Sequence, residues 1–213
     1  EVIVNLAAQT NIDECEACPQ NAYLVNVKIV ENLARWIENN GNSCHLVQIS
    51  TDHIYDSPGP NKEDDIALIN YYGFSKYAGE LVAEKVNSTI LRTNFFGRIQ
   101  SPDKRSFSDW LVDSLIKRTA ITVFDDVYFS PLSLQHLSEL LELVILKRHK
   151  GTFNLGSREG MSKADFAFKL AEVLGLPTEN MRRGSVAEVN LVARRAKDMR
   201  MDSSSFEKVF EVE

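Results

Sequence analysis

Residues 45–55 read His-Leu-Val-Gln-Ile-Ser-Thr-Asp-His-Ile-Tyr, and this stretch decides the fold. Its first five residues predict a buried strand, which runs directly into the polar sequence Ser50-Thr51-Asp52. Apolar residues then recur at helical spacing over residues 69–86, and residues 88–92 predict a further buried strand. A strand, a long helix and a second strand in this order indicate a βαβ unit.

The same alternation extends toward the N-terminus. Residues 2–6 predict a fully buried strand, and Pro19 is well placed to open a helix. Apolar residues continue at helical spacing as far as Ile37, and Gly41 stops the pattern. Repeated βαβ units predict an α/β protein with a parallel sheet.

The C-terminal half carries weaker patterns of the same kind. Residues 107–116 and 134–146 predict helices, and residues 152–155 predict a short strand. Ser162 and Asp165 have the spacing of a capping box, and they open a helix that ends at Gly175.

Composition excludes several classes of protein. The chain has 213 residues, of which 44% are hydrophobic, and a net charge of −6. An acidic chain is not typical of nucleic-acid binders, which usually have a basic excess. No apolar run approaches the roughly 18 residues of a membrane helix, and the N-terminal residues do not resemble a signal peptide. We therefore expect no nucleic-acid partner, no membrane partner and a cytoplasmic location.

Three cysteines are present, and two of them form the sequence Cys15-x-x-Cys18. A zinc site needs four ligands, and the sequence offers no second pair, so we expect no metal. The neighbouring residues Asp13, Glu14 and Glu16 disfavour a thiolate, which argues against redox chemistry. We expect these cysteines to be free and structural.

Tyr72 and Lys76 are the strongest candidates for catalysis. Spaced four residues apart on a predicted helix, they lie on one face. A nearby ammonium lowers the pKa of a phenol, which would let Tyr72 exchange a proton near neutral pH. Thr51 follows a buried strand, where ligands bind in open α/β sheets, and it could hydrogen-bond a substrate oxygen beside Tyr72.

Several segments together resemble the extended short-chain dehydrogenase/reductase family, in its sugar-nucleotide branch, and most of all the dTDP-4-dehydrorhamnose reductases. The resemblance covers nearly the whole chain. The matching segments are residues 4–10, 13–19, 22–26, 49–55, 71–80, 91–97, 129–131, 151–156 and the region around Arg194.

The resemblance implies a role for each candidate residue. Tyr72 would be the catalytic acid/base, Lys76 its partner and a ligand of the nicotinamide ribose, and Thr51 would orient the substrate carbonyl. Both Tyr72 and Lys76 would thus also contact the cofactor, which is NADPH or NADH. The other implied contacts are Ala7, Ala8 and Thr10 for the cofactor, and Thr51, Asp52 and Asn94 for the nucleotide-sugar substrate.

The resemblance also implies a Rossmann-like, doubly wound parallel sheet of strand order 3-2-1-4-5-6, with a small C-terminal substrate-binding part. Residues 1–93 would be the rest of the dinucleotide-binding domain, and residues 94–213 would mainly bind substrate, interleaved with that core. Residues 2–6, 45–49 and 88–92 would be strands four, five and six, so the N-terminal strands are missing.

A glycine-rich cofactor loop of the form G-x-x-G-x-x-G is expected in this family and is absent from the sequence. The sequence also begins inside a predicted strand, which suggests a piece of a longer protein. We then expect strand 2–6 to be an exposed apolar edge. The chain alone should bind cofactor poorly, be inactive and self-associate, and a homodimer is one assembly that the resemblance allows.

The second departure is His53, which stands where sugar-nucleotide dehydratases of this superfamily typically have Glu. This argues against dehydratase activity and favours reduction of a nucleotide-linked 4-keto-6-deoxy sugar, a step of deoxysugar and polysaccharide biosynthesis. Two alternatives stay open. One is a sugar-nucleotide epimerase, and the other is a non-catalytic regulatory subunit, as in methionine adenosyltransferase.

Basic side chains that could hold a substrate diphosphate are a weaker prediction, because most surface cations are simply solvated. They are Arg98, Lys104, Arg105, Arg182, Arg183, Arg194 and Arg195.

Overall fold

A parallel sheet of four strands forms the centre of the protein. The computed structural model describes residues 1–41, 43–98 and 106–212. The sheet has the order β1-β2-β3-β8, and every neighbouring pair is parallel. The strands are β1 (Val2–Asn5), β2 (His45–Thr51), β3 (Ser88–Thr93) and β8 (Gly151–Leu155). The predicted α/β fold with a parallel sheet, and the predicted adjacency of its first three strands, are confirmed.

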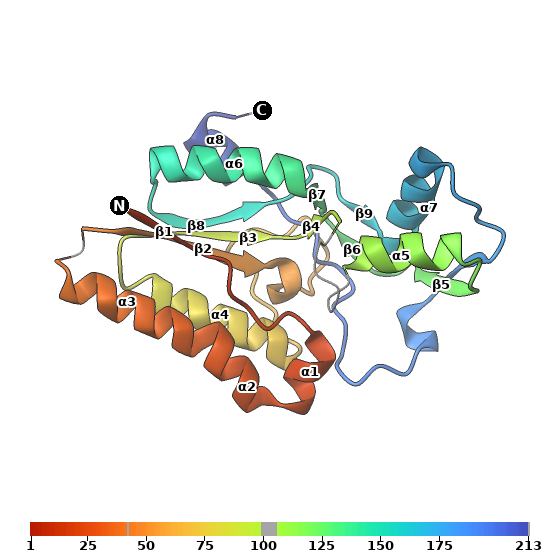
Figure 1. Cartoon of the computed structure of the whole chain (residues 1–213), viewed down its shortest axis with the longest axis horizontal. Coiled ribbons are helices and arrows are strands. Elements are labelled where there is room, and N and C mark those ends of the chain that lie inside the picture. Colours follow the sequence, from red (N-terminus) through yellow and green to blue (C-terminus); the bar gives the residue numbers. More distant parts are fainter. Residues whose placement is uncertain (42, 99–105, 213) are drawn as a thin grey trace.

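Helices cover both faces of this sheet (Figure 1). Helices α3 (Ile29–Asn39) and α4 (Tyr71–Ala83) pack on one face, where Val30, Leu46 and Ala83 belong to one apolar cluster. Helices α6 (Leu134–Lys147) and α8 (Ser204–Phe210) pack on the other face, around a second apolar cluster. Apolar layers on both sides explain why β2 and β3 are buried along their whole length.

Strand β1 differs from its prediction. Val2, Ile3 and Val4 are only half-buried, and Leu6 just beyond the strand is 68% exposed. In the described part of the chain β1 pairs with β2 alone, so it is an edge strand of this sheet. The prediction of a fully buried strand is therefore wrong, whereas the predicted exposed edge is present.

The helix predicted from Pro19 to Ile37 is present but not uniform. Helix α2 (Pro19–Tyr23) begins with Pro19 in its first turn, and α3 ends at Asn39 with Asn40 as its cap. Between them lies a π-helical segment, η1 (Leu24–Lys28), which the sequence pattern does not predict. A short helix, α1 (Ile12–Ala17), precedes α2 and was also not predicted.

The remaining elements form a second group beside the sheet (Figure 1). Helix α5 (Phe107–Ile116) has its predicted bounds, and α7 (Lys163–Leu174) is capped by Ser162 and ends at Gly175 as predicted. The short strands are β4 (Phe95–Phe96), β5 (Ile121–Phe124), β6 (Tyr128–Phe129), β7 (Leu132–Ser133), β9 (Met161–Ser162) and β10 (Met181–Gly184). The 3₁₀ segments are η2 (Asp52–Ile54) and η3 (Val186–Glu188).

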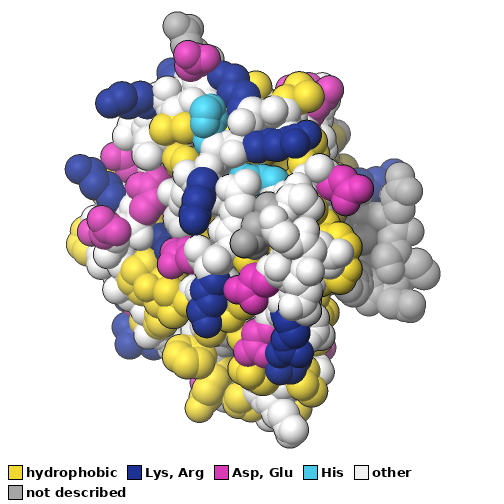
Figure 2. Space-filling view, turned by 90° about the vertical axis from the view of Figure 1, so that its left-hand side faces the viewer, with side chains coloured by type: hydrophobic (Ala, Val, Ile, Leu, Met, Phe, Trp, Pro, Cys, Tyr) yellow, Lys and Arg dark blue, Asp and Glu magenta, His cyan; other side chains and the backbone are white. Residues whose placement is uncertain are grey.

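The end of the molecule seen on the left of Figure 1 has a mixed surface. Figure 2 shows basic and acidic side chains interspersed there with hydrophobic ones. Among the described residues, no helix is long and apolar enough to cross a membrane. The strands of the sheet point their carboxyl ends away from this surface, toward the second group of elements.

Candidate active site

Tyr72 and Lys76 lie one turn apart on the buried face of α4. Asn70 caps this helix by accepting a hydrogen bond from the backbone N–H of Gly73 (2.9 Å). Tyr72 is 8% exposed and Lys76 is 4% exposed. The Lys76 ammonium donates a 2.6 Å hydrogen bond to the carbonyl of Ile49 in β2, so it lies against the carboxyl-terminal half of that strand.

The polar sequence after β2 forms a tight turn beside Tyr72. The Thr51 hydroxyl accepts a hydrogen bond from the His53 N–H (3.2 Å), which caps η2. Asp52 is fully buried and accepts hydrogen bonds from Thr51 (3.3 Å) and from the amide of Asn94 (2.7 Å). The His53 ring meets the Tyr72 ring edge-on, with 5.5 Å between centroids. Four of the predicted site residues therefore lie close together.

The protonation state of Tyr72 differs from the expectation. Burial raises the pKa of its phenol well above the ordinary value, and a hydrogen bond with Thr51 opposes this only in part. The Lys76 ammonium contacts the Ile49 carbonyl and does not lower the phenol pKa here. The prediction that Lys76 lowers this pKa is thus wrong for this structure. Tyr72 is held as a neutral phenol, which is the form that can donate a proton.

The pKa of Lys76 is shifted in the opposite direction, downward. Burial lowers its pKa to about 8, although the nearby Glu80 carboxylate favours the charged form. Lys76 thus titrates much nearer to neutral pH than an exposed lysine does.

Glycines allow α4 to approach its neighbours closely. A Cβ on Gly73 would clash with the backbone carbonyl of His53, and one on Gly79 would clash with that of Asn26 in η1. Asn26 is buried, and its amide donates to Ser75 Oγ (2.9 Å) and to the carbonyl of Gln9 (3.1 Å). Asn26 Oδ1 also accepts from the Gln9 N–H (2.8 Å). Asn26 therefore fixes the loop after β1 to α4, a role that the sequence pattern does not predict.

That loop carries the predicted cofactor contacts. Ala7 and Thr10 are exposed and Ala8 is half-buried, and all three follow the carboxyl end of β1. The buried Lys76 ammonium has one acceptor, Ile49 O, among the described residues, and its other N–H groups are available to a ligand. Small side chains on the loop and a buried cation behind it fit the nicotinamide ribose end of a dinucleotide. The pyrophosphate end would need a glycine-rich loop that this sequence does not contain.

A cavity of about 480 Å³ opens next to this group. It brings Thr10, His53 and Asn94 together with Lys163 and Arg195. Its other walls are apolar side chains from α1, α5, β5, the turn after β5 and the C-terminal segment (residues 193–203): Ile12, Phe107, Phe124, Val127, Ala196 and Met199. A largely apolar cavity with a few converging polar groups is the usual form of a small-molecule site.

Of the basic side chains predicted to hold a diphosphate, Arg195 lines this cavity. Arg182 pairs with Glu188, and Arg183 pairs with Asp125 and Asp165 on the surface. Lys104 and Arg105 lie outside the described residues. Lys163, at the start of α7, was not predicted, because nothing in its sequence context distinguishes it from a solvated helix residue.

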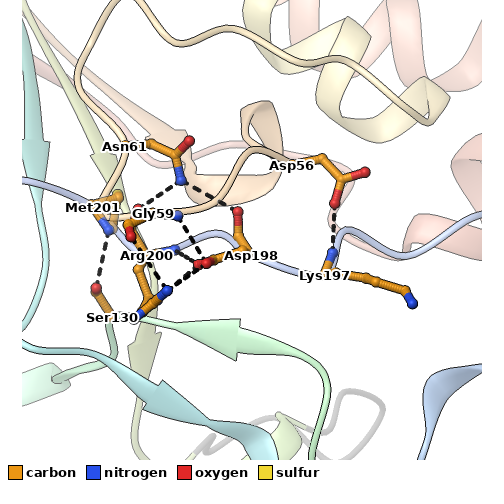
Figure 3. Close-up of polar contacts among 8 residues, drawn as sticks. All are labelled: Asp56, Gly59, Asn61, Ser130, Lys197, Asp198, Arg200 and Met201. Atoms are coloured by element: carbon orange, nitrogen blue, oxygen red, sulfur yellow. Dashed lines mark hydrogen bonds and ion pairs between the residues drawn. The ribbon is translucent and has the colours of Figure 1, made fainter.

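The C-terminal segment reaches the cavity through a network of polar contacts (Figure 3). Asp198 accepts hydrogen bonds from the Gly59 N–H (2.8 Å) and from the Arg200 guanidinium (2.6 Å). Asn61 donates to the backbone carbonyls of Asp198 (3.3 Å) and Arg200 (2.9 Å). Nearby, Arg195 forms an ion pair with Asp13 of α1 (2.7 Å). The segment therefore connects α1 with the loop that follows η2, and it closes one wall of the cavity.

The cysteines have a structural environment. Cys15 and Cys44 are buried and Cys18 is exposed, and all three are free thiols. Burial, together with the charges of Glu14 and Glu16, raises the pKa of Cys15 to about 11. Among residues 1–41, 43–98 and 106–212, no three His, Cys, Asp or Glu side chains are placed to hold a metal ion.

Comparison with known proteins agrees with this geometry. The RmlD substrate binding domain family matches residues 1–213. The chain belongs to this family. It is 28% identical to the probable low-salt glycan biosynthesis reductase Agl14 of Haloferax volcanii, over 97% of this chain and 71% of that protein. It is 27% identical to methionine adenosyltransferase 2 subunit beta of Rattus norvegicus, over 97% of this chain and 64% of that one.

Among solved structures, the dTDP-4-dehydrorhamnose reductase of Bacillus anthracis in complex with NADP is similar, with a TM-score of 0.89 and 25% identity. The match covers 100% of this chain and 75% of that one. The sequence-based resemblance to this family is confirmed. The chain spans roughly two thirds to three quarters of the length of these three relatives.

Proposed function

We propose that this protein reduces the 4-keto group of a nucleotide-linked 6-deoxy sugar, with NADPH or NADH as the source of hydride. The observation that supports this proposal is the buried, neutral Tyr72 phenol beside the Thr51 hydroxyl, packed against His53, which lines the 480 Å³ cavity. A carbonyl reductase needs a proton donor at this point, and a neutral phenol is one.

Each residue then has a defined task in the reduction. The nicotinamide, when bound, supplies hydride to the carbonyl carbon. The Thr51 hydroxyl turns from Asp52 to donate a hydrogen bond to the carbonyl oxygen and so stabilises the developing negative charge. Tyr72 gives its proton to that oxygen, and the Lys76 ammonium, held by the Ile49 carbonyl, is placed to donate a hydrogen bond to the nicotinamide ribose. Ala7, Ala8 and Thr10 border the cofactor, and Asp52 and Asn94 position the substrate through their mutual hydrogen bond.

The wider setting belongs to the same proposal. The substrate-binding part would begin near residue 94, the protein would act in the cytoplasm, and its product would serve deoxysugar and polysaccharide biosynthesis.

The assay uses protein expressed from its complete gene, dTDP-4-dehydrorhamnose and NADPH. We expect loss of nicotinamide absorbance and formation of the 4-hydroxy sugar by mass spectrometry. No loss of absorbance and no hydroxyl product would refute the proposal.

A regulatory subunit is the second candidate, because the chain is 27% identical to methionine adenosyltransferase 2 subunit beta. This alternative predicts a stoichiometric partner enzyme in a pulldown and unchanged function in Tyr72→Phe. An epimerase, by contrast, would retain its cofactor through purification and consume none.

A further inference from the structure

Lys163 is a half-buried cation without a counter-ion in contact. It is the first residue of α7, and its ammonium lines the cavity that also contains His53 and Asn94. The ammonium lies 3.5 Å from the centroid of the Phe129 ring and 4.7 Å from that of Phe107. Among the described residues, no carboxylate lies within ion-pair distance of it. Aromatic faces stabilise such a cation only partly.

The cavity wall as a whole favours an anion. Its described lining includes Lys163 and Arg195 but no Asp or Glu. Arg195 is already paired with Asp13, so Lys163 carries the uncompensated charge. Asp52 lies behind the wall, where Thr51 and Asn94 donate to its carboxylate. A cleft lined by one sign of charge concentrates ligands of the opposite sign.

We propose that Lys163 binds the diphosphate of the nucleoside diphosphate sugar, as the residue that selects an anionic substrate for this cavity. The identity of the sugar rests on the proposed function. His53 packs against Tyr72 and lines the same cavity as Lys163. A substrate whose sugar lies beside Tyr72 therefore places its diphosphate, the next group along, within reach of the Lys163 ammonium.

If Lys163 binds the diphosphate, binding should be accompanied by uptake of protons from solution. Burial lowers its pKa to about 8, although Asp52 favours the charged form. The other groups that face it are His53 and Arg195, with the Phe107 ring from α5 and the Phe129 ring from β6. A bound diphosphate stabilises the ammonium and raises its pKa. Binding at about pH 8 should then take up roughly half a proton per site.

The test is calorimetric titration of the wild type with dTDP, UDP and thymidine, at about pH 7 and about pH 8, in buffers of different ionisation enthalpy. Lys163→Met should weaken binding of the nucleoside diphosphate by about 10- to 100-fold, as expected for a charged hydrogen bond, and abolish proton uptake. Binding of thymidine, which has no phosphate, should not change. Lys163→Arg should retain the affinity within a few-fold but take up no proton, because arginine does not titrate there.

Lys169→Met is the matched control, because Lys169 lies on the same helix but pairs with Glu172 on the surface. It should bind both nucleotides as the wild type does. The proposal is overturned if neither nucleoside diphosphate binds the wild type, if Lys163→Met binds with unchanged affinity, or if it loses thymidine binding equally. None of these binding measurements requires turnover. If nucleoside diphosphate affinity depends on Lys163 but the protein shows no reductase activity, the proposed function is refuted and this inference stands.

Discussion

Gly79 of α4 lies against the backbone carbonyl of Asn26 in the π-helical segment η1, with no room for a Cβ atom between them. This contact sets how closely α4, which carries Tyr72 and Lys76, approaches the helix that holds the loop after β1. Asn26 fixes that loop through two hydrogen bonds to Gln9. The catalytic residues on α4 and the loop after β1 are therefore held together by one close backbone contact.

Gly79→Ala tests this contact. In an unobstructed helix the change stabilises a protein by up to about 1 kcal/mol. Here the added methyl group must displace the Asn26 carbonyl, so we expect a loss of about 1–3 kcal/mol and a lower melting temperature. Leu81→Ala, at an exposed position of the same helix, is the control and should change stability much less. A raised melting temperature for Gly79→Ala would show that the contact does not constrain the helices.

Tyr72→Phe removes the proton that the proposed reduction needs and preserves the ring. Turnover should fall by about 10²–10⁴-fold, the usual contribution of general acid catalysis, while the dissociation constant for NADPH stays nearly unchanged. Tyr71→Phe is the matched control, because Tyr71 is 47% exposed on the same helix. Near-normal turnover in Tyr72→Phe would mean that another group protonates the substrate.

The rate of reduction should also depend on pH through Lys76. Burial lowers its pKa to about 8, so the ammonium is lost as the pH rises through that value. The rate at limiting NADPH should be constant at lower pH and fall above about pH 8, because a neutral amine makes a weaker hydrogen bond to the nicotinamide ribose than the ammonium does. Lys76→Met should be slow throughout and lack this alkaline decline, and it should also bind cofactor more weakly. An unchanged alkaline profile in Lys76→Met would assign the titration to another group.

Periodicity and motif spacing were enough to predict the parallel sheet and the residues around Tyr72, since both are encoded locally. Strand β2 and the turn that follows it are contiguous in sequence, so Thr51 could be placed beside Tyr72 from the βαβ pattern, whereas Asp52 was implied only by the family resemblance and the contact of His53 with Tyr72 was not predicted. Lys163 could not be found in this way. It reaches the cavity because α7 packs beside residues far away in sequence. The predicted direction of the Tyr72 pKa shift was also wrong, because the burial that raises this pKa depends on the whole tertiary structure.

The buried ion pair between Glu80 and Arg92 ties α4 to β3. Arg92 donates to Glu80 through Nη2 (2.7 Å) and Nε (3.1 Å), and it also donates to the Tyr55 hydroxyl (2.8 Å). Glu80→Gln leaves the guanidinium buried without its counter-charge, so the free energy of unfolding should fall by about 3–5 kcal/mol in urea denaturation. Glu172→Gln, which breaks an exposed pair, should lower it far less, because solvent screens that pair. Equal effects of the two changes would contradict a structural role for the buried pair.

Asp198 holds the C-terminal segment that closes one wall of the cavity. Its Oδ2 accepts from the Gly59 N–H and from Arg200 Nη2, and its Oδ1 accepts from the Arg200 N–H (3.1 Å) and Nε (2.9 Å), whereas an amide in its place can accept at only one oxygen. Asp198→Asn should lower the free energy of unfolding by about 1–3 kcal/mol and raise the KM for the nucleotide sugar more than it lowers kcat. Glu188→Gln, on a nearby exposed turn, is the control and should leave both unchanged.

The pH dependence of this effect follows from the Asp198 pKa. Burial raises that pKa, but the hydrogen bonds from Arg200 and Gly59 outweigh burial and hold it below the ordinary value. A carboxylate whose folded pKa lies below its unfolded pKa contributes its full stabilisation above about pH 4, and this is lost as the pH falls through the folded pKa. The stabilities of the wild type and Asp198→Asn should therefore differ at neutral pH and converge in acid. A difference that persists unchanged in acid would mean that the Asp198 charge contributes nothing, and that Asp198→Asn acts through packing alone.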